Sequence, residues 1–266
     1  MDQKDSIRPG DLEEDRLERS RRIGWLDVDK IERSRCVVVG AGALGNELVK
    51  NLVLSGFRDI LLIDMDHVVR SNLNRCVFFR DEDADVKAMK AEVVAKRAAE
   101  LNPEARFGSH VGRVEELDWK TFKEYDLVFG CLDNVSARLH VNSHSYYAGV
   151  PFIDGGTDGF SGKVHVVLPP STPCIQCSMN RSHFKVLEKR YSCTGADVVF
   201  HERKLAAEIT TTSIIAAVQV REGLKVLSGQ KERCIKNVMF YNGLLGTSEE
   251  YELAIDPSCP NHPDRS

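Results

Sequence analysis

The chain has 266 residues, of which 42% are hydrophobic and 29% are charged, and its formal net charge is −4 at pH 7. These values suit one large α/β domain with insertions, or one and a half domains. They give no reason to expect nucleic acid or an anionic membrane as a partner, and no apolar run approaches the length of a membrane span.

The N-terminal segment is strongly charged. Residues 1–22 contain no apolar stretch of the kind found in signal peptides, so we expect a cytoplasmic protein whose eight cysteines are thiols, metal ligands or core residues rather than disulfides. Asp11–Arg22 predicts a charged helix with few apolar anchors. Such a helix is either a solvated surface or an arm that lies on a partner subunit, and its residues alone favour neither interpretation.

The next stretch carries a nucleotide-binding fingerprint. Cys36–Val39 is a short β-branched run typical of a buried strand, the glycine-rich turn Gly40–Gly45 follows at once, and Asn46–Ser55 has helical spacing. Asp59–Ile63 is a second predicted strand and is followed by Asp64. Strand, glycine turn, helix, strand and acid, in this order, predict a dinucleotide-type fold.

The chemistry of this turn suits phosphate. Gly40, Gly42 and Gly45 allow a tight turn and a close approach of phosphate to the backbone, and the N-terminus of the next helix attracts negative charge. Asp64 can accept hydrogen bonds from ribose hydroxyl groups. NAD and ATP both fit this pattern, and a glycine-rich turn without a ligand is the alternative interpretation.

Helices and strands continue to alternate up to about residue 155. A polar loop with Arg75 follows the second strand, at the edge where open α/β sheets bind ligands. The alternation predicts a Rossmann-like, doubly wound and mainly parallel sheet. The other predicted elements of this half are a helix at Val86–Leu101, a strand ending near Val111, a short helix at Leu117–Tyr125, a strand at Asp126–Cys131, a helix at Ser136–Tyr147 and a strand at Val150–Ile153.

The pattern changes after residue 160. Gly162–Leu168 alternates apolar and polar residues, as expected of an antiparallel strand. Residues 178–203 are polar without clear periodicity and predict a long crossover loop, and loops of this length are usually functional or disordered. Leu205–Leu227 then predicts a helix, with Ile214 and Ile215 on its apolar face, and Val238–Tyr241 and Tyr251–Ile255 predict antiparallel C-terminal strands.

Two pairs of predicted metal ligands lie about eighty residues apart. Cys174 and Cys177 form a CxxC, and Cys259 and His262 form a CxxH. Two such pairs suit a tetrahedral structural zinc ion held by three thiolates and one imidazole, a zinc knuckle that ties the C-terminal tail to the crossover. A redox CxxC and unrelated surface cysteines are the alternatives, although the prolines before Cys174 are not typical of a redox site.

The other cysteines differ in their surroundings. Cys36, Cys131 and Cys234 are expected in the core, and Cys76 adjoins an arginine. Cys193 lies in the polar loop with cationic residues nearby, a setting that lowers the pKa of a thiol and favours a nucleophile. A spare surface cysteine fits the local surroundings of Cys193 equally well.

These elements divide the chain into four predicted parts. Residues 1–30 form an N-terminal helical arm, and residues 31–170 form the nucleotide-binding core. Residues 171–204 hold the first zinc half-site and the crossover loop. Residues 205–266 hold the C-terminal helix, the antiparallel strands and the second zinc half-site.

Together these pieces resemble the ubiquitin-like-activating enzymes and their bacterial relatives that adenylate the sulfur carriers of molybdopterin and thiamine synthesis. The resemblance runs from about Arg16 to His262, and dehydrogenases share only its first two elements. It rests on the order and spacing of Gly40–Gly45, Asp64-Met65-Asp66, Asn72-Leu73-Asn74-Arg75, Lys90 in its helix before Asn102-Pro103, Cys131-Leu132-Asp133-Asn134 followed by Arg138, and the two pairs of metal ligands.

The resemblance implies an ATP site and assigns roles to its residues. Asp64 would hold the ribose, Lys90 would meet the triphosphate, and Asp133 would bind Mg²⁺. Arg16 would reach across a homodimer to the γ-phosphate, with Arg19 as the alternative. The implied nucleotide-binding set is Gly40, Gly42, Ala43, Gly45, Asp64, Asp66, Asn74, Arg75, Lys90, Asp133 and Asn134, and the implied catalytic set is Arg16, Arg75, Lys90, Asp133 and Cys193.

The implied reaction begins when the C-terminal carboxylate of a ubiquitin-like protein ending in Gly-Gly attacks the α-phosphate of ATP, giving an acyl adenylate and pyrophosphate. Cys193 would then take the acyl group as a thioester for transfer to a conjugating enzyme. Two features depart from the family: Cys76 replaces the usual glutamine, and the spacing from Cys193 to the next helix is long. A sulfur-carrier adenylyltransferase without a thioester step and an inactive scaffold subunit are the alternatives.

Overall fold

The computed structural model describes residues 16–179 and 207–262 of the chain. In these residues eight strands form one sheet in the order β3-β2-β1-β4-β5-β6-β7-β8. The strands from β3 to β5 in this order pair in parallel, and β5, β6, β7 and β8 pair antiparallel. Their bounds are β1 Arg35–Val39, β2 Asp59–Ile63, β3 Arg106–His110, β4 Leu127–Gly130, β5 Phe152–Asp158, β6 Ser161–Val167, β7 Val238–Asn242 and β8 Thr247–Tyr251.

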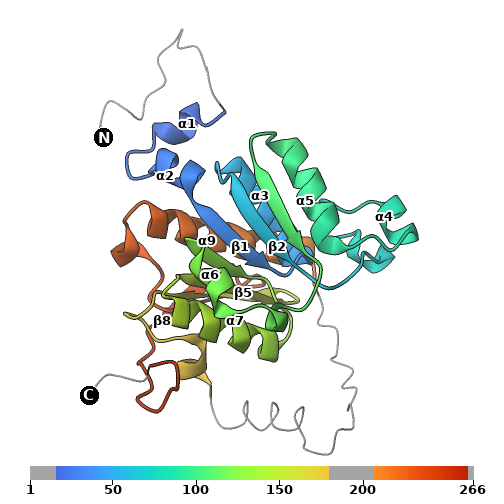
Figure 1. Ribbon diagram of the computed structural model, residues 1–266. Helices are drawn as coiled ribbons and strands as arrows, with labels where there is room; N and C mark the ends of the chain where they lie inside the picture. The colour runs from blue at the N-terminus through green and yellow to red at the C-terminus, as the bar shows by residue number, and fades with distance from the viewer. Residues whose placement is uncertain (1–15, 180–206, 263–266) are drawn as a thin grey trace, which may run out of the picture.

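Helices cover both faces of the parallel half of the sheet (Figure 1). The alternation along β1 divides the core, because Cys36 and Val38 belong to one apolar cluster and Val37 and Val39 to the other. The first cluster includes side chains of α3 (Ala43–Leu54), α5 (Lys90–Leu101) and α9 (Ile209–Leu227), and the second includes those of α6 (Trp119–Lys123) and α7 (Val135–Ala148). This arrangement confirms the predicted doubly wound sheet with antiparallel C-terminal strands.

Shorter helical pieces complete the described part of the chain. They are α1 (Glu18–Arg21), α2 (Val28–Arg33), η2 (Arg70–Asn72), α4 (Asp81–Asp85), η3 (Val114–Glu116), η4 (Ile175–Ser178) and η5 (Lys231–Arg233). Within the described ranges, none of the helices is both long enough and apolar enough to cross a membrane.

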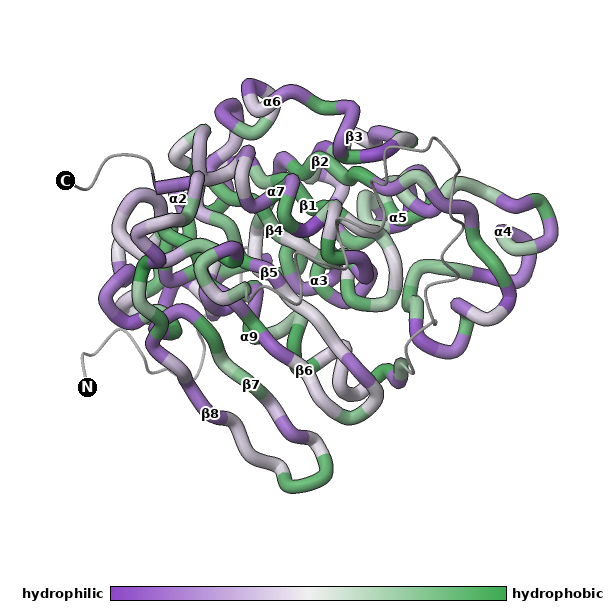
Figure 2. Tube along the Cα trace, turned by 90° about the horizontal axis from the view of Figure 1, so that it is seen from below, coloured by the Kyte–Doolittle hydropathy of each residue, from purple (hydrophilic) through white to green (hydrophobic). Residues whose placement is uncertain are grey.

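The β7–β8 hairpin projects from the rest of the fold with an apolar tip, as Figure 2 shows. Its four-residue loop places Leu244 and Leu245 at the tip, where they are 72% and 73% exposed. The amide of Gly243 donates to the carbonyl of Phe160, in the turn between β5 and β6, at 2.8 Å. The two hairpin turns therefore lie side by side.

Several predicted boundaries were wrong by a few residues. The helix predicted at Val86–Leu101 begins at Lys90, because Lys87 has a left-handed φ of 51° and cannot continue a helix. The strand predicted at Tyr251–Ile255 is instead β8, which ends at Tyr251 because the hairpin pairs Tyr251 with Val238. The helix expected from residue 46 already begins at residue 43 with Gly42 as its N-cap.

The helix predicted at Leu205–Leu227 begins at Ile209 in the described residues, because the Glu208 carboxylate caps it by accepting the amides of Thr210 and Thr211. Ile214, expected on the apolar face, is exposed, whereas its neighbour Ile215 is fully buried. The four-part division of the chain stays a prediction.

Candidate functional site

The carboxyl ends of the parallel strands meet at one edge of the sheet. Val39 of β1 pairs with Ile63 of β2 and Gly130 of β4, and Gly130 pairs with Asp154 of β5. The glycine turn, the Asp64–Asp66 loop and the Cys131–Asn134 loop therefore leave the sheet at the same level. This is the edge at which doubly wound sheets bind ligands.

The glycine turn is sterically demanding at two positions and open at a third. Gly40 has a φ of +100°, and a Cβ there would lie 2.4 Å from the carbonyl oxygen of Cys131. A Cβ on Gly45 would lie 2.0 Å from the carbonyl oxygen of Gly40. A Cβ on Gly42 would meet no heavy atom within 4 Å, and no side chain caps the N-terminus of α3 at this residue. The turn therefore presents open space and amide groups to an anion.

The acids that follow β2 bind the backbone and a lysine. Asp64 accepts from the amide of Ala41 at 2.6 Å and from that of Asp66 at 2.8 Å, so it joins β2 to the glycine turn. Burial raises the pKa of the Asp64 carboxyl, and the charge of Lys90 and the two amides oppose this rise. The Lys90 ammonium lies 2.7 Å from Asp66, and its side chain is only 12% exposed.

The loop after β2 holds the predicted phosphate contacts. The Arg75 guanidinium donates to Asn74 Oδ1 at 2.9 Å and to the carbonyl of Ser71, so it is already oriented by its own loop. Cys76 is buried, and this burial raises the pKa of its thiol to about 11. A buried thiol with a raised pKa is a poor nucleophile, so Cys76 reads as a packing residue.

The loop after β4 leads into α7. Asp133 is exposed and makes no hydrogen bond or ion pair within the described ranges. Asn134 caps α7 by accepting from the amide of Ala137 at 2.7 Å. Cys131, just before them, is half-buried, and desolvation raises the pKa of its thiol above its ordinary value.

Two predicted catalytic residues lie away from this edge or outside the described residues. Arg16 donates to the carbonyl of Leu101, at the last residue of α5, whereas Lys90 begins the same helix beside the glycine turn. Twelve helical residues span roughly 18 Å, so Arg16 lies at the far edge of the sheet from its own nucleotide site. Cys193 and all but the first two residues of the predicted crossover loop (178–203) fall within residues 180–206, outside the described residues.

The four predicted metal ligands come together. Their ligand atoms all lie within 4.8 Å of one another. Cys174 Sγ is 3.9 Å from Cys177 Sγ and 3.6 Å from Cys259 Sγ, and His262 Nε2 is 3.3 Å from Cys177 Sγ. A tetrahedral ion with bonds of about 2.3 Å to sulfur and about 2.0 Å to nitrogen would place sulfurs about 3.8 Å apart and a sulfur and a nitrogen about 3.5 Å apart. The cluster can therefore hold a metal ion, and its members are not unrelated surface cysteines.

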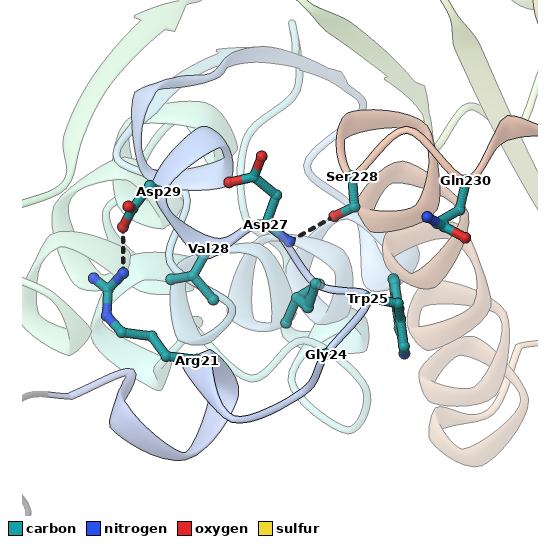
Figure 3. A pocket seen from close by; sticks show the side chains of 9 residues that line it. Arg21, Gly24, Trp25, Asp27, Val28, Asp29, Ser228 and Gln230 are labelled. Carbon is teal, nitrogen blue, oxygen red and sulfur yellow. Dashed lines mark hydrogen bonds and ion pairs between the residues drawn. The ribbon is translucent and has the colours of Figure 1, made fainter. Parts of the chain in front are cut away.

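A separate hollow is lined by other residues. Figure 3 shows it between the segment before α2 and the end of α9, with Trp25, Asp27 and Ser228 among its lining side chains. Its volume is about 540 Å³, and the amide of Asp27 donates to Ser228 Oγ across it at 3.0 Å. None of the predicted site residues lines this hollow.

Comparison with known proteins decides the family. The ThiF family profile matches residues 15–261. The chain belongs to the ThiF family. This membership confirms the resemblance read from the motifs.

Named relatives match part of the chain. SUMO-activating enzyme subunit 2 of Dictyostelium discoideum is 40% identical over 145 residues, which cover 54% of this chain and 22% of that protein. The NEDD8-activating enzyme E1 catalytic subunit of Arabidopsis thaliana is 38% identical over 158 residues, which cover 54% of this chain and 34% of that protein. The chain thus spans about a fifth to a third of the length of these curated relatives.

Solved structures share the fold. E. coli MccB with MccA-N7isoASN superposes with a TM-score of 0.75 at 19% identity, covering 96% of this chain and 76% of that one. E. coli MccB with ATP gives a TM-score of 0.70 at 20% identity, covering 88% and 68%. At this identity, the likeness establishes the ThiF-type fold alone.

This ThiF-family chain also has a buried charge cluster that the sequence did not single out as a unit. Arg138 of α7 pairs with Asp154 within β5 and donates to the carbonyl of Leu132. Burial raises the pKa of the Asp154 carboxyl, and the charges of Arg138 and Lys163 oppose the rise. Burial, followed by the Arg138 charge, lowers the pKa of the Lys163 ammonium. The signal available in the sequence was an acid after a strand, as at Asp64 and Asp133, but its partner depends on the tertiary structure.

Proposed function

We propose that this chain binds ATP at the carboxyl edge of its parallel strands and adenylates the C-terminal glycine carboxylate of a ubiquitin-like protein. The observation that carries the proposal is the convergence at one edge of the uncapped α3 N-terminus, the Lys90–Asp66 pair and the exposed Asp133. Membership of the ThiF family supports it, as do relatives whose names are activating enzymes for SUMO and NEDD8.

In the first step, the triphosphate lies on the amides at the start of α3, and Lys90 turns from Asp66 to the phosphates. Asp64 holds the ribose, and Asn74 and Arg75 contact the phosphate oxygens. The carrier carboxylate attacks the α-phosphorus in line, and the bond to the bridging oxygen breaks so that pyrophosphate leaves with the electron pair. Catalysis here requires alignment and positive charge rather than proton transfer.

Asp133 is the carboxylate that would hold Mg²⁺, because it is exposed at this edge and makes no hydrogen bond or ion pair in the described part of the chain. When bound, this ion supplies charge neutralisation to the phosphates. Asn134 lies beside it at the start of α7 and completes the nucleotide-facing surface.

In the second step, the thiolate of Cys193 attacks the carbonyl carbon of the acyl adenylate. The carbon–sulfur bond forms, the bond from that carbon to the phosphate oxygen breaks, and AMP leaves. The thioester is then transferred to the cysteine of a conjugating enzyme. The basic residues Lys189, Arg190, Arg203 and Lys204 near Cys193 in the sequence support a low thiol pKa.

The test of this second step uses a labelled carrier protein ending in Gly-Gly, Mg²⁺ and ATP with the full chain. We expect a covalent conjugate that disappears with a thiol reductant in the intact protein and is absent in Cys193→Ala. A conjugate that survives Cys193→Ala would reject Cys193 as the acyl acceptor. Pyrophosphate release without any conjugate would instead support the sulfur-carrier adenylyltransferase.

The carrier protein docks on the adjacent hairpin turns. Leu244 and Leu245 of the β7–β8 hairpin and Phe160 of the β5–β6 turn are exposed apolar side chains. The β5–β6 turn extends from the carboxyl end of β5, so this surface lies at the nucleotide edge. Exposed apolar groups at neighbouring turns suit a protein partner rather than a small molecule.

This surface is tested by the substitution Leu244→Ser. We expect the KM for the carrier to rise about tenfold or more, with the KM for ATP unchanged, because only the protein substrate loses a buried contact. Leu54→Ser is the matched control, since Leu54 is 52% exposed on α3. Equal effects of the two substitutions would place the docking surface elsewhere.

Homodimerisation would bring Arg16 to a nucleotide site. Arg16 lies at the far edge of its own sheet, so in this arrangement it would serve the nucleotide site of a second copy rather than its own. There its guanidinium would meet the γ-phosphate and stabilise the negative charge that moves to pyrophosphate.

The Cys174, Cys177, Cys259 and His262 cluster holds zinc in this proposal. Three thiolates and an imidazole at tetrahedral spacing suit Zn²⁺, which has no redox chemistry and serves such sites as a structural ion. Its part is to tie the C-terminal segment to the turn after β6.

A further inference from the structure

The last turn of α7 touches the metal-ligand cluster through one side chain. The Tyr146 hydroxyl lies 2.7 Å from His262 Nδ1 and 3.1 Å from the carbonyl oxygen of Pro170. The rings of Tyr146 and His262 pack with their centroids 4.4 Å apart, and His262 is buried. The opposite ring nitrogen of His262, Nε2, faces Cys177 Sγ at 3.3 Å.

The chemistry of these groups fixes the direction of each hydrogen bond. A carbonyl oxygen can only accept a hydrogen bond, so the Tyr146 hydroxyl donates its hydrogen bond to the carbonyl of Pro170. The hydroxyl oxygen is then the acceptor of a hydrogen bond from the N–H group at His262 Nδ1. A neutral imidazole protonated at Nδ1 carries its lone pair on Nε2, which is the nitrogen that faces the thiols.

We propose that Tyr146 is a positioning residue for the metal site, because its hydroxyl holds His262 in the tautomer and orientation that direct Nε2 to the ion. Tyr146 contacts no ion itself and acts only through His262. This role lies beyond the proposed adenylation and concerns the histidine as fourth ligand. A cysteine at that position would have no tautomer to select and would not need the hydroxyl.

The contact also joins the metal site to the nucleotide edge. α7 begins at the Asn134 cap beside Asp133 and reaches Tyr146 twelve residues later, a rise of roughly 18 Å. The same helix makes a second contact with the metal-ligand segment, because Asn142 Oδ1 accepts a hydrogen bond from the amide of Ile175 at 2.9 Å. The position of His262 is thus set by a helix that is fixed at both ends.

The test is a double-substitution cycle read by zinc affinity. Zinc competition with a chromophoric chelator is measured on the full chain, on Tyr146→Phe, on His262→Cys and on the double variant. Tyr146→Phe keeps the ring packed against His262 and removes only the hydroxyl, so we expect a ten- to hundredfold loss of zinc affinity. In the His262→Cys background, the same substitution should change the affinity less than about threefold.

Tyr147→Phe is the matched control, since Tyr147 is the neighbouring residue of α7 and its ring packs on Trp119 instead. It should leave zinc affinity unchanged. An equal loss from Tyr146→Phe in both backgrounds would assign Tyr146 a packing role and overturn the proposal. No zinc binding by the unsubstituted chain would overturn the metal site itself.

A second measurement needs no substitution. Nitrogen-15 NMR of the zinc-loaded chain with labelled histidine should report a metal-bound Nε2 and a protonated Nδ1 for His262, with slow exchange of that proton. A protonated Nε2 or a metal-bound Nδ1 would overturn the assignment. Tyr146→Phe should speed the exchange of the Nδ1 proton, whereas Tyr147→Phe should not.

Discussion

Breaking the Arg138–Asp154 ion pair should destabilise the fold more than any other single loss of charge at the nucleotide edge. Asp154 is 1% exposed and the Arg138 side chain is 11% exposed, so neither charge is well solvated. Arg138→Met keeps much of the side-chain volume but leaves the carboxylate with the Lys163 ammonium as its nearest counter-charge. Removing one partner of a buried pair costs about 3–5 kcal/mol, and we expect Arg138→Met to fall in this range.

The loss of stability in Arg138→Met should depend on pH. Burial already raises the pKa of the Asp154 carboxyl in the folded state above its value in the unfolded chain. Between these two pKa values the folded state holds a proton that the unfolded state has released, so the free energy of unfolding falls as pH rises through this range. Arg138→Met removes the main opposing charge and raises this pKa further. The penalty at about pH 8 should therefore exceed the penalty at about pH 5. Urea denaturation at both pH values measures it.

Two controls decide the interpretation. Arg70 pairs with Asp81 and Asp85 on the surface, and Arg70→Met should cost no more than about 1 kcal/mol because these charges are exposed. The double substitution of Arg138→Met with Asp154→Asn should be more stable than Arg138→Met alone, since the buried carboxylate that lost its main counter-charge is then also removed. A cost below about 1 kcal/mol for Arg138→Met, or no recovery in the double variant, would refute the reasoning.

Two further predictions concern the glycine turn and the dimer. Gly45→Ala places a Cβ 2.0 Å from the carbonyl oxygen of Gly40, so it should lower the free energy of unfolding in urea denaturation by at least about 1–3 kcal/mol. Gly42→Ala should lower it by no more than about 1 kcal/mol, because its Cβ enters only open space. Because this open space is where the phosphates would lie, Gly42→Ala should instead weaken ATP binding in calorimetry. Equal loss of stability in both would contradict this account of the turn. The variants Arg16→Ala and Asp133→Asn should each abolish adenylation. Mixing the two variants should restore about a quarter of the activity, because half of the dimers are then mixed and each mixed dimer has one intact site. No recovery on mixing would reject a site shared between two subunits.

Much of the fold could be predicted because its signals are local. The short apolar runs at β1 and β4, the glycine turn and the alternation along β6 each specify an element without help from distant residues. The errors lie where tertiary structure decides. The start of α5 depends on the left-handed Lys87, and the end of β8 depends on its pairing with β7.

The candidate site likewise contains residues that the sequence predicts and contacts that only the tertiary structure determines. The metal ligands could be paired because CxxC and CxxH have a spacing set by tetrahedral coordination, whatever the distance between them in the chain. The Arg138–Asp154 pair and the Tyr146–His262 contact could not, because each depends on how α7 is rotated against the sheet and the C-terminal segment. Sequence motifs indicate which residues meet a ligand and leave open which residues hold them in place.

ATP–pyrophosphate exchange is the measurement that decides whether this chain activates a protein carboxylate with ATP. Purified full chain is incubated with Mg²⁺, ATP, labelled pyrophosphate and candidate carriers that end in Gly-Gly, with the same carriers lacking the last glycine as controls. We expect exchange that requires the intact carrier, persists in Cys193→Ala and is lost in Asp133→Asn. The absence of exchange with every carrier, for a folded chain that binds ATP, would contradict the account and favour an inactive scaffold.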